Sequence, residues 1–388
     1  MKKLTIIFII FLFEYQAFAQ PVKTGAQLTE KYIPLLKGQK IAIVANHTSM
    51  IDKTHLVDSL INLDINIIKI FSPEHGFRGK AAPGEKIQSG TDEKTGIPVI
   101  SLYGKKKKPH IKELMDVDWV VFDIQDVGVR FYTYISTMHY VMEACAQTNT
   151  KFMVLDRPNP NGFYIDGPVL KNQFKSFVGM HPIPVVHGLT IGELASMIVG
   201  ESWIDNANKL HMTVIPCENY DHTVRYQLPV KPSPNLMNMQ SVYLYPSLAL
   251  FEGTVVSIGR GTDFPFQVYG HPGFPDTLFS FTPSSNEGSK HPKHQNVTCY
   301  GYDLREEQVL NSFFQYPEIN LHYLFNAWSL YNNSEEFFNS FFLMLEGSGY
   351  LKDQIKNGLY PEEIKLSWQD DLKKYRNMRK KYLLYKDF

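Results

Sequence analysis

The chain has 388 residues, more than one hydrophobic core usually holds, and this length favours two domains. Lysine plus arginine and aspartate plus glutamate both number 39, so no net field would hold the protein on nucleic acid or on an anionic membrane. The composition, 44% apolar and 20% charged, is that of a globular protein and excludes general disorder.

The first 20 residues have the pattern of a cleavable export signal. Two lysines precede an apolar run at 4–13, and the small-residue pattern AFA follows at 17–19. The run is short for a bilayer span, which needs about 20 residues. We therefore expect residues 1–20 to be removed as a signal peptide, leaving no membrane span, and the mature protein to be periplasmic or secreted.

Residues 21–165 alternate short apolar runs with segments of helical spacing. The runs lie at 40–47, 65–72, 97–104, 118–126 and 151–158, and the helical segments at 54–63, 111–117 and 133–148. Runs that are apolar on both faces are typical of a covered parallel sheet. The alternation predicts an α/β fold, a Rossmann-like doubly wound parallel sheet.

The second half, residues 166–388, has a different pattern. Thr190 followed by Glu193 predicts a capped helix, and short β-like runs occur at 211–218, 254–261 and 296–304. An amphipathic segment at 361–385 ends the chain. We expect a smaller α+β domain here, with a boundary near residue 165.

Several cofactor and metal motifs are missing from the sequence. VANHTSM stands where GxGxxG would follow the first strand, and neither GxxxxGK[ST], HExxH nor GxSxG occurs. The three cysteines lie far apart and form no zinc knuckle, so we expect them to be buried or incidental. A zinc site would therefore need scattered ligands.

Polar clusters follow four of the apolar runs, at 46–49, 74–75, 123–126 and 156–159. Ligands of doubly wound sheets bind beyond the carboxyl ends of the strands. Glu74 follows a proline there, between aromatic and glycine neighbours, where partial desolvation would raise its pKa and suit it to general acid catalysis. The structural alternative is a surface ion pair with Arg78.

The segment DIQDVGVRFYTY, 123–134, is denser in polar groups. Its carboxylates and Gln125 can hold sugar hydroxyls, and Arg130 can bind an anionic group bidentately. Alternatively, Asp126 caps a helix beginning near Val129 and Arg130 pairs with it. For Asp156, in LDRPNPNG, an ordered turn is a sufficient explanation. A further mixed segment, 251–270, places Arg260 between two glycines, with aromatic residues that suit either a sugar face or the core.

Eight blocks spread over the mature chain carry a family resemblance. They include NHTS (46–49), SPEHGFRG (72–79), TGIPVISLYG (95–104), DIQDVGVRFYTYISTM (123–138), LDRPNPNG (155–162), IPVVHGLTIGELA (183–195), FEGTVVSIGRGTDFPFQVYG (251–270) and YLLY (382–385). The chain resembles the exo-β-N-acetylmuramidases of the NamZ type, glycoside hydrolase family one hundred and seventy-one. The resemblance implies a Rossmann-like domain, a smaller α/β domain and an active site in the cleft between them. It also implies that terminal, non-reducing N-acetylmuramic acid (MurNAc) is released from peptidoglycan fragments without a metal or organic cofactor.

In this family a glutamate of the SPEHG block is the favoured catalytic candidate, which here is Glu74. Glycoside hydrolysis needs a carboxyl group to protonate the leaving oxygen and a second group at the anomeric carbon. We assign Glu74 the first role and Asp126 or Asp123 the second; alternatively, the acetamido group of the substrate supplies the nucleophile and needs only a carboxylate to orient it. Arg130 and Arg260 are candidates to bind the lactyl carboxylate of MurNAc. The predicted substrate-binding set is Asn46, His75, Arg78, Gln125, Arg130, Tyr132, Asp156, Glu252, Arg260 and Asp263.

The expected partners are peptidoglycan-derived saccharides such as MurNAc linked to N-acetylglucosamine (GlcNAc). Two other classes of protein share some of these features. A non-catalytic wall-binding protein would use the same arginines and aromatic residues but would not need Glu74. A metal-dependent amidase or esterase of the wall would lose its activity with a chelator.

Overall fold

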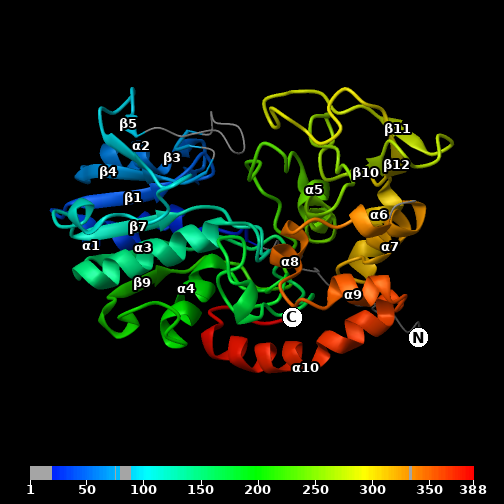
Figure 1. Cartoon of the computed structure of the whole chain (residues 1–388). Coiled ribbons are helices and arrows are strands. Elements are labelled where there is room, and N and C mark those ends of the chain that lie inside the picture. The colour runs from blue at the N-terminus through cyan, green and yellow to red at the C-terminus, as the bar shows by residue number, and fades with distance from the viewer. Residues whose placement is uncertain (1–19, 75, 79–88, 332–333) are drawn as a thin grey trace, which may run out of the picture.

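The computed structural model describes residues 20–74, 76–78, 89–331 and 334–388, so the predicted signal peptide lies almost entirely outside the described residues. The chain forms a sheet-based part and a part richer in helices and loops, and the long C-terminal helix runs beneath both in the view of Figure 1. No helix in these ranges is both long and apolar enough to cross a membrane.

The first part is built on a seven-stranded sheet with the order β5-β6-β4-β1-β7-β8-β9. Its strands are β1 (Ile41–Ala45), β4 (Ile67–Ser72), β5 (Gly90–Thr91), β6 (Pro98–Ser101), β7 (Trp119–Asp123), β8 (Lys151–Leu155) and β9 (Met212–Ile215). All neighbours pair in parallel except the short edge strand β5. Each of the five predicted runs contains one parallel strand, and their order, third-second-first-fourth-fifth, is that of a doubly wound sheet. The predicted fold class is confirmed.

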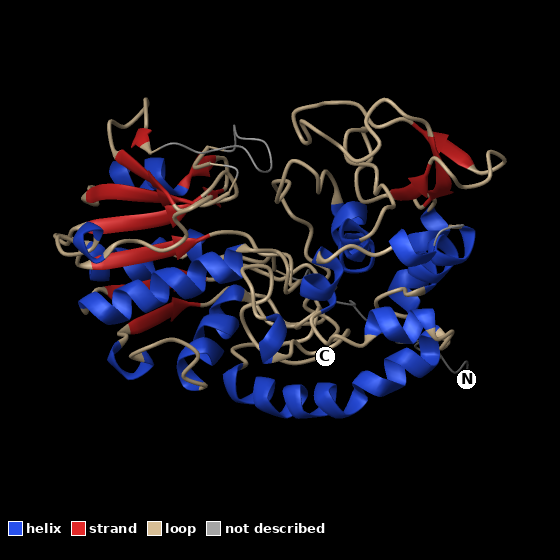
Figure 2. Ribbon diagram, viewed as in Figure 1, coloured by secondary structure: helices blue, strands red, loops and turns tan. Residues whose placement is uncertain are grey.

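Helices cover both faces of this sheet (Figure 2). On β1, Ile41 and Ile43 pack in a cluster with residues of α1 (Thr29–Leu36) and α2 (Leu56–Asn62), whereas Val44 packs in a cluster with α3 (Tyr134–Thr148) and α4 (Ile191–Gly200). Burial on both faces is the reason that the runs are continuously apolar. Helix α4 begins with the predicted capping box, in which the Thr190 hydroxyl accepts from the Glu193 backbone N–H.

Two sequence-based expectations for this part need correction. The first part continues past the boundary predicted near residue 165, because β9 pairs in parallel with β8 and α4 packs on the same sheet. The segment 111–117 forms only a 3-10 turn, Ile111–Glu113, rather than a longer helix. A small hairpin, β2 (Met50–Ile51) with β3 (Thr54–His55), follows β1.

The second part contains α5 (Met239–Leu248) and a three-stranded antiparallel sheet of β10 (Val268–His271), β12 (Cys299–Asp303) and β11 (Phe279–Phe281). Five helices follow or flank it: α6 (Glu307–Gln315), α7 (His322–Leu330), α8 (Phe341–Glu346), α9 (Leu351–Lys356) and α10 (Pro361–Arg379). The run at 254–261 makes only isolated bridges, because Gly259 and Gly261 turn the chain with φ of 76° and 83°. The amphipathic C-terminal helix is shorter than expected and ends at Arg379.

The segment after α10 returns to the first part of the molecule. The Tyr385 hydroxyl donates to Asp156 Oδ2 at 2.6 Å and accepts from the Cys217 backbone N–H at 2.8 Å. Asp156 is fully buried, and its carboxylate also accepts from the Thr190 hydroxyl and the Gly192 N–H. Asp156 therefore organises the fold, and its predicted contact with substrate does not fit this position.

Replacing Tyr385 with phenylalanine should lower the free energy of unfolding by about 1–3 kcal/mol, because the change leaves a buried N–H unpaired and removes a donor from a buried carboxylate. Urea denaturation measures the effect. Tyr360→Phe is the matched control, since Tyr360 is 71% exposed. Equal stabilities of the two variants would show that the C-terminal segment is not held through this hydroxyl.

Candidate active site

A pocket of about 180 Å³ lies between the two parts of the molecule. Its wall contains Glu74, Phe131, Tyr132, Thr133, Tyr134, Val178, Ser233, Asn235, Leu236, Tyr245, Glu252, Arg260 and Phe266. Four predicted site residues, Glu74, Tyr132, Glu252 and Arg260, therefore meet here although they are far apart in the sequence.

Glu74 reaches this pocket because it follows the carboxyl end of β4. The strand ends at Ser72, Pro73 breaks the pairing, and Glu74 is partly exposed on the pocket wall. The Tyr134 hydroxyl lies 3.5 Å from the backbone oxygen of Glu74. The loop thus carries an available carboxyl group at the edge of the sheet where doubly wound folds bind ligands.

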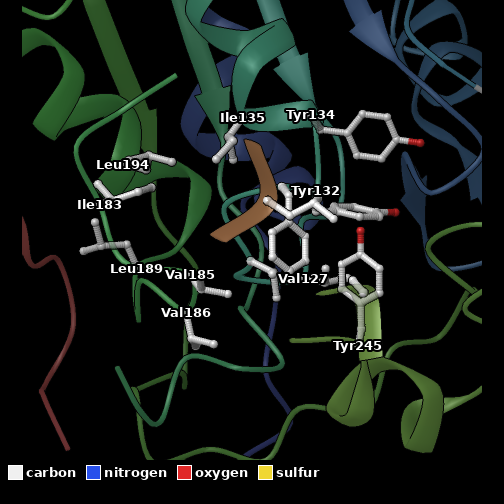
Figure 3. Packing of buried hydrophobic residues seen from close by; sticks show 14 of the residues in the cluster. Val127, Tyr132, Tyr134, Ile135, Ile183, Val185, Val186, Leu189, Leu194 and Tyr245 are labelled. Carbon is white, nitrogen blue, oxygen red and sulfur yellow. The ribbon is translucent and has the colours of Figure 1, made fainter. Parts of the chain in front are cut away.

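Three tyrosines surround the position of Glu74. Tyr132 and Tyr134 precede and begin α3, and Tyr245 lies on α5; the Tyr132 ring meets the other two edge-on, with centroid distances of 5.0 and 6.0 Å. Figure 3 shows their hydroxyl groups on one side, away from the aliphatic side chains of Ile183 and Leu189. Burial raises the pKa of each phenol and the Glu74 carboxylate raises it further. The phenols therefore remain protonated hydrogen-bond donors beside Glu74.

The pocket wall also carries the ion pair of Arg260 and Glu252, in which each side chain keeps one polar atom without a partner among the described residues. Arg260 donates through Nε, at 2.7 Å, and through Nη2 to the same oxygen of Glu252, Oε1. Within the described part of the chain, Glu252 Oε2 and Arg260 Nη1 have no hydrogen-bond partner. The flanking turn depends on Gly261, because a Cβ there would lie 2.5 Å from the Ser284 carbonyl oxygen. A second pocket of about 290 Å³ also has Glu252 and Arg260 in its wall.

Asp123 does not reach the pocket and its charge is already neutralised. Arg157 donates to its two oxygens at 2.5 and 2.9 Å, and both side chains are almost completely buried. A carboxylate held in this way cannot act on a substrate, so we correct the assignment of Asp123 as a possible second catalytic group.

Asp126 is also absent from the pocket wall. It is 4% exposed, and its Oδ2 accepts from the Gly128 N–H at 2.6 Å, while Oδ1 has no hydrogen-bond partner in the described structure. Its charge contributes to the raised pKa of Tyr132 and Tyr245. Asp126 therefore influences the pocket through its charge, which raises the pKa of these wall tyrosines, and does not itself line the pocket.

Arg130 has a position unlike that of Arg260. Its side chain is fully buried, and its two terminal nitrogens donate to the carbonyl oxygens of Pro168, Ile183, Leu345 and Glu346 at 2.7–2.9 Å. Burial lowers the pKa of Arg130 to about 10. Arg130 connects the segments around Pro168 and Ile183 to the end of α8, and we correct the prediction that it binds the lactyl carboxylate.

The other predicted residues support the loops around the pocket. Asn46 is buried beside Tyr134, where its side chain partly offsets the rise in the pKa of the phenol that burial causes. Gln125 donates to the carbonyl oxygens of Asp126 and Pro158. Neither side chain is part of the pocket wall.

Arg78 and Asp263 also lie away from the wall. Arg78 pairs with Asp92 and Asp58 rather than with Glu74, and it lowers the pKa of Asp92 to about 2. Asp263 is exposed. These positions do not fit the predicted contacts with substrate, whereas His75 lies outside the described residues.

Sequence reasoning missed Tyr134, Tyr245, Ser233 and Asn235 as pocket residues. Tyr134 lies in the block 123–138, where three neighbouring aromatic residues could have indicated a sugar-binding wall. Asn235 lies in a loop without a recognisable motif, and this loop is placed by a hydrogen bond from the Tyr132 hydroxyl to the Pro232 carbonyl oxygen at 2.7 Å. Among the described residues, no group of three or more histidine, cysteine, aspartate or glutamate side chains is arranged to hold a metal ion.

Comparisons with known proteins agree with this architecture. The model of "Exo-beta-N-acetylmuramidase NamZ, N-terminal" matches residues 41–240, and that of the C-terminal domain matches 243–385. The fold and the matched family models define the protein as a glycoside hydrolase. The chain belongs to the NamZ exo-β-N-acetylmuramidase family. The first family model ends at residue 240 and the second begins at residue 243, so the boundary between them lies in the first turn of α5.

Individual relatives cover nearly the whole chain. It is 40% identical to the peptidoglycan β-N-acetylmuramidase NamZ of Bacillus subtilis (strain 168), with 94% of this chain and 91% of the relative aligned. Two crystal structures of DUF1343 family proteins from Bacteroides fragilis NCTC 9343 are similar to it. One has a TM-score of 0.87, 46% identity and coverage of 95% of this chain and 100% of its own. The other has a TM-score of 0.76, 28% identity and coverage of 94% and 99%.

Proposed function

We propose that this protein releases MurNAc from the non-reducing ends of peptidoglycan fragments, with Glu74 as the proton donor. The observation that carries this proposal is the placement of Glu74, from the end of β4, in one pocket with Arg260 and Glu252 from the second part of the molecule. Residues 1–20 direct export in this proposal, so the enzyme meets its substrate in the periplasm or outside the cell.

Glu74 would protonate the glycosidic oxygen as the bond to the anomeric carbon breaks. Asp123 is neutralised and Asp126 lies behind the pocket wall, so the acetamido group of the substrate is the best-placed nucleophile. Its carbonyl oxygen bonds to the anomeric carbon while the leaving sugar takes the proton of Glu74. Water then opens the cyclic intermediate and returns a proton to Glu74. The Tyr245 hydroxyl can donate a hydrogen bond to the sugar, whereas the Tyr132 hydroxyl already donates to the Pro232 carbonyl oxygen and can only accept one.

Arg260 would select MurNAc over GlcNAc. The two sugars differ by a lactyl carboxylate, which can accept a charge-assisted hydrogen bond from the unused Nη1 of Arg260. The adjoining pocket of about 290 Å³ gives this substituent room beside the same arginine.

Replacing Arg260 with alanine should raise the inhibition constant of MurNAc by about 10- to 100-fold and leave that of GlcNAc within about threefold, since only MurNAc loses a hydrogen bond to a charged group. Inhibition of 4-nitrophenyl N-acetylmuramide hydrolysis measures both constants. Arg305→Ala is the matched control, because Arg305 also pairs with a carboxylate, that of Asp303, but lies outside the pocket. Equal losses for both sugars would remove the selectivity role.

A further inference from the structure

A separate pocket of about 600 Å³ lies across α5 from the candidate active site. Tyr243 and Ser247 line it, whereas Tyr245 lines the active-site pocket. Residues 243 and 247 are about one helical turn apart, and residue 245 points to the opposite side of the helix. One rigid element therefore positions both pockets, which share no wall residue.

Aromatic rings form much of the wall of the pocket of about 600 Å³. Phe313 packs against Tyr243 with a centroid distance of 5.6 Å, and Arg225 lies 3.4 Å from the centroid of the neighbouring Phe163 ring. Tyr316, in contrast, is 66% exposed although it belongs to the pocket wall. The pocket thus combines a fixed aromatic floor with an accessible ring.

The polar part of the wall suits an uncharged ligand. Gln308 has no side-chain hydrogen bond within the described structure. The Glu318 carboxylate pairs with Lys365, and the Nε2 of His322 lies 3.3 Å from a carboxylate oxygen of Glu362. Among the described residues, no lysine or arginine lines the pocket. An anionic polymer would therefore find no cation on this wall, whereas amide and hydroxyl groups would find hydrogen-bonding partners.

We propose that this pocket is a second glycan-binding site, which holds uncharged N-acetylhexosamine units of a peptidoglycan strand while the active site works on a chain end. The inference rests on the proposed function, because that function makes glycan strands the available ligand. Sugar rings have an apolar face and a rim of hydroxyl and amide groups, which match the aromatic floor and the polar wall. The volume lies within the usual range of about 300–1,000 Å³ for ligand pockets.

The test combines two substitutions, Tyr316→Ala and Gln308→Ala, in the full-length protein. In a Glu74→Gln background, affinity for an uncharged oligomer of β-1,4-linked GlcNAc is measured by isothermal titration. We expect about a tenfold loss of affinity from the double substitution, because one aromatic contact and one hydrogen bond disappear. Tyr360→Ala is the control, since Tyr360 is similarly exposed and outside both pockets.

Kinetics with intact Glu74 provide the second readout. The double variant should show a raised KM on glycan strands and an unchanged kcat/KM on 4-nitrophenyl N-acetylmuramide. Unchanged affinity for the GlcNAc oligomer overturns the proposal, as does a loss seen equally with free stem peptides, which would make the pocket a peptide site. Failure of the proposed function would appear differently, as absence of turnover by the unaltered protein, and the titration would still decide whether the pocket binds glycan.

Discussion

Replacing Glu74 with glutamine should lower kcat on the disaccharide MurNAc-GlcNAc by about 10²- to 10⁴-fold, the usual contribution of a positioned general acid. Glutamine keeps the size of the side chain and removes its transferable proton. On 4-nitrophenyl N-acetylmuramide the loss in the bond-breaking step should be smaller, because nitrophenolate leaves with little help from an acid. Single-turnover assays on both substrates separate this step from later ones.

Glu252→Gln is the matched control for this experiment, since Glu252 is the other carboxylate on the pocket wall. It should weaken binding through its effect on Arg260 and reduce the rates on both substrates by similar factors. A Glu74→Gln variant that also loses equal factors on both substrates would not have lost a proton donor. Wild-type rates on the disaccharide would exclude Glu74 from catalysis altogether.

Replacing Arg130 with methionine should lower the free energy of unfolding by about 3 kcal/mol or more. Four buried carbonyl oxygens would lose their donor, and each unsatisfied buried acceptor costs about 1–3 kcal/mol. Methionine fills similar space, so the loss reports on hydrogen bonding more than on a cavity. Guanidinium chloride denaturation followed by circular dichroism measures the change.

Arg260→Met provides the comparison, because Arg260 bonds a carboxylate on the partly open pocket wall. That variant should keep most of its stability and lose selectivity for MurNAc. The reverse pattern, a stable Arg130→Met protein without selectivity, would restore the original assignment of Arg130 to the lactyl carboxylate.

Much of the fold could be predicted from local patterns. The continuous apolar runs identified five of the six parallel strands because a strand covered on both faces carries apolar side chains in both directions, as β1 does. Thr190 and Glu193 predicted the start of α4 because a capping box is completed within four residues. The domain boundary was harder, because β9 joins the sheet only after a long excursion through residues 156–211, and no local pattern states which sheet a strand will join.

The residues of the candidate site also fall into those that the sequence placed and those that only the tertiary structure placed. The sequence by itself determined that Glu74 follows a strand and precedes a glycine-containing segment, and the parallel sheet then placed this carboxyl group where ligands bind. It did not distinguish Arg130 from Arg260, since both are arginines in glycine-containing, aromatic-rich segments. Only the tertiary structure decided between them: Leu345 and Glu346, more than 200 residues away, surround the Arg130 guanidinium with carbonyl oxygens. Arg260 lines the pocket and keeps one nitrogen without a partner among the described residues, because a guanidinium binds whichever acceptors the folded chain brings to it.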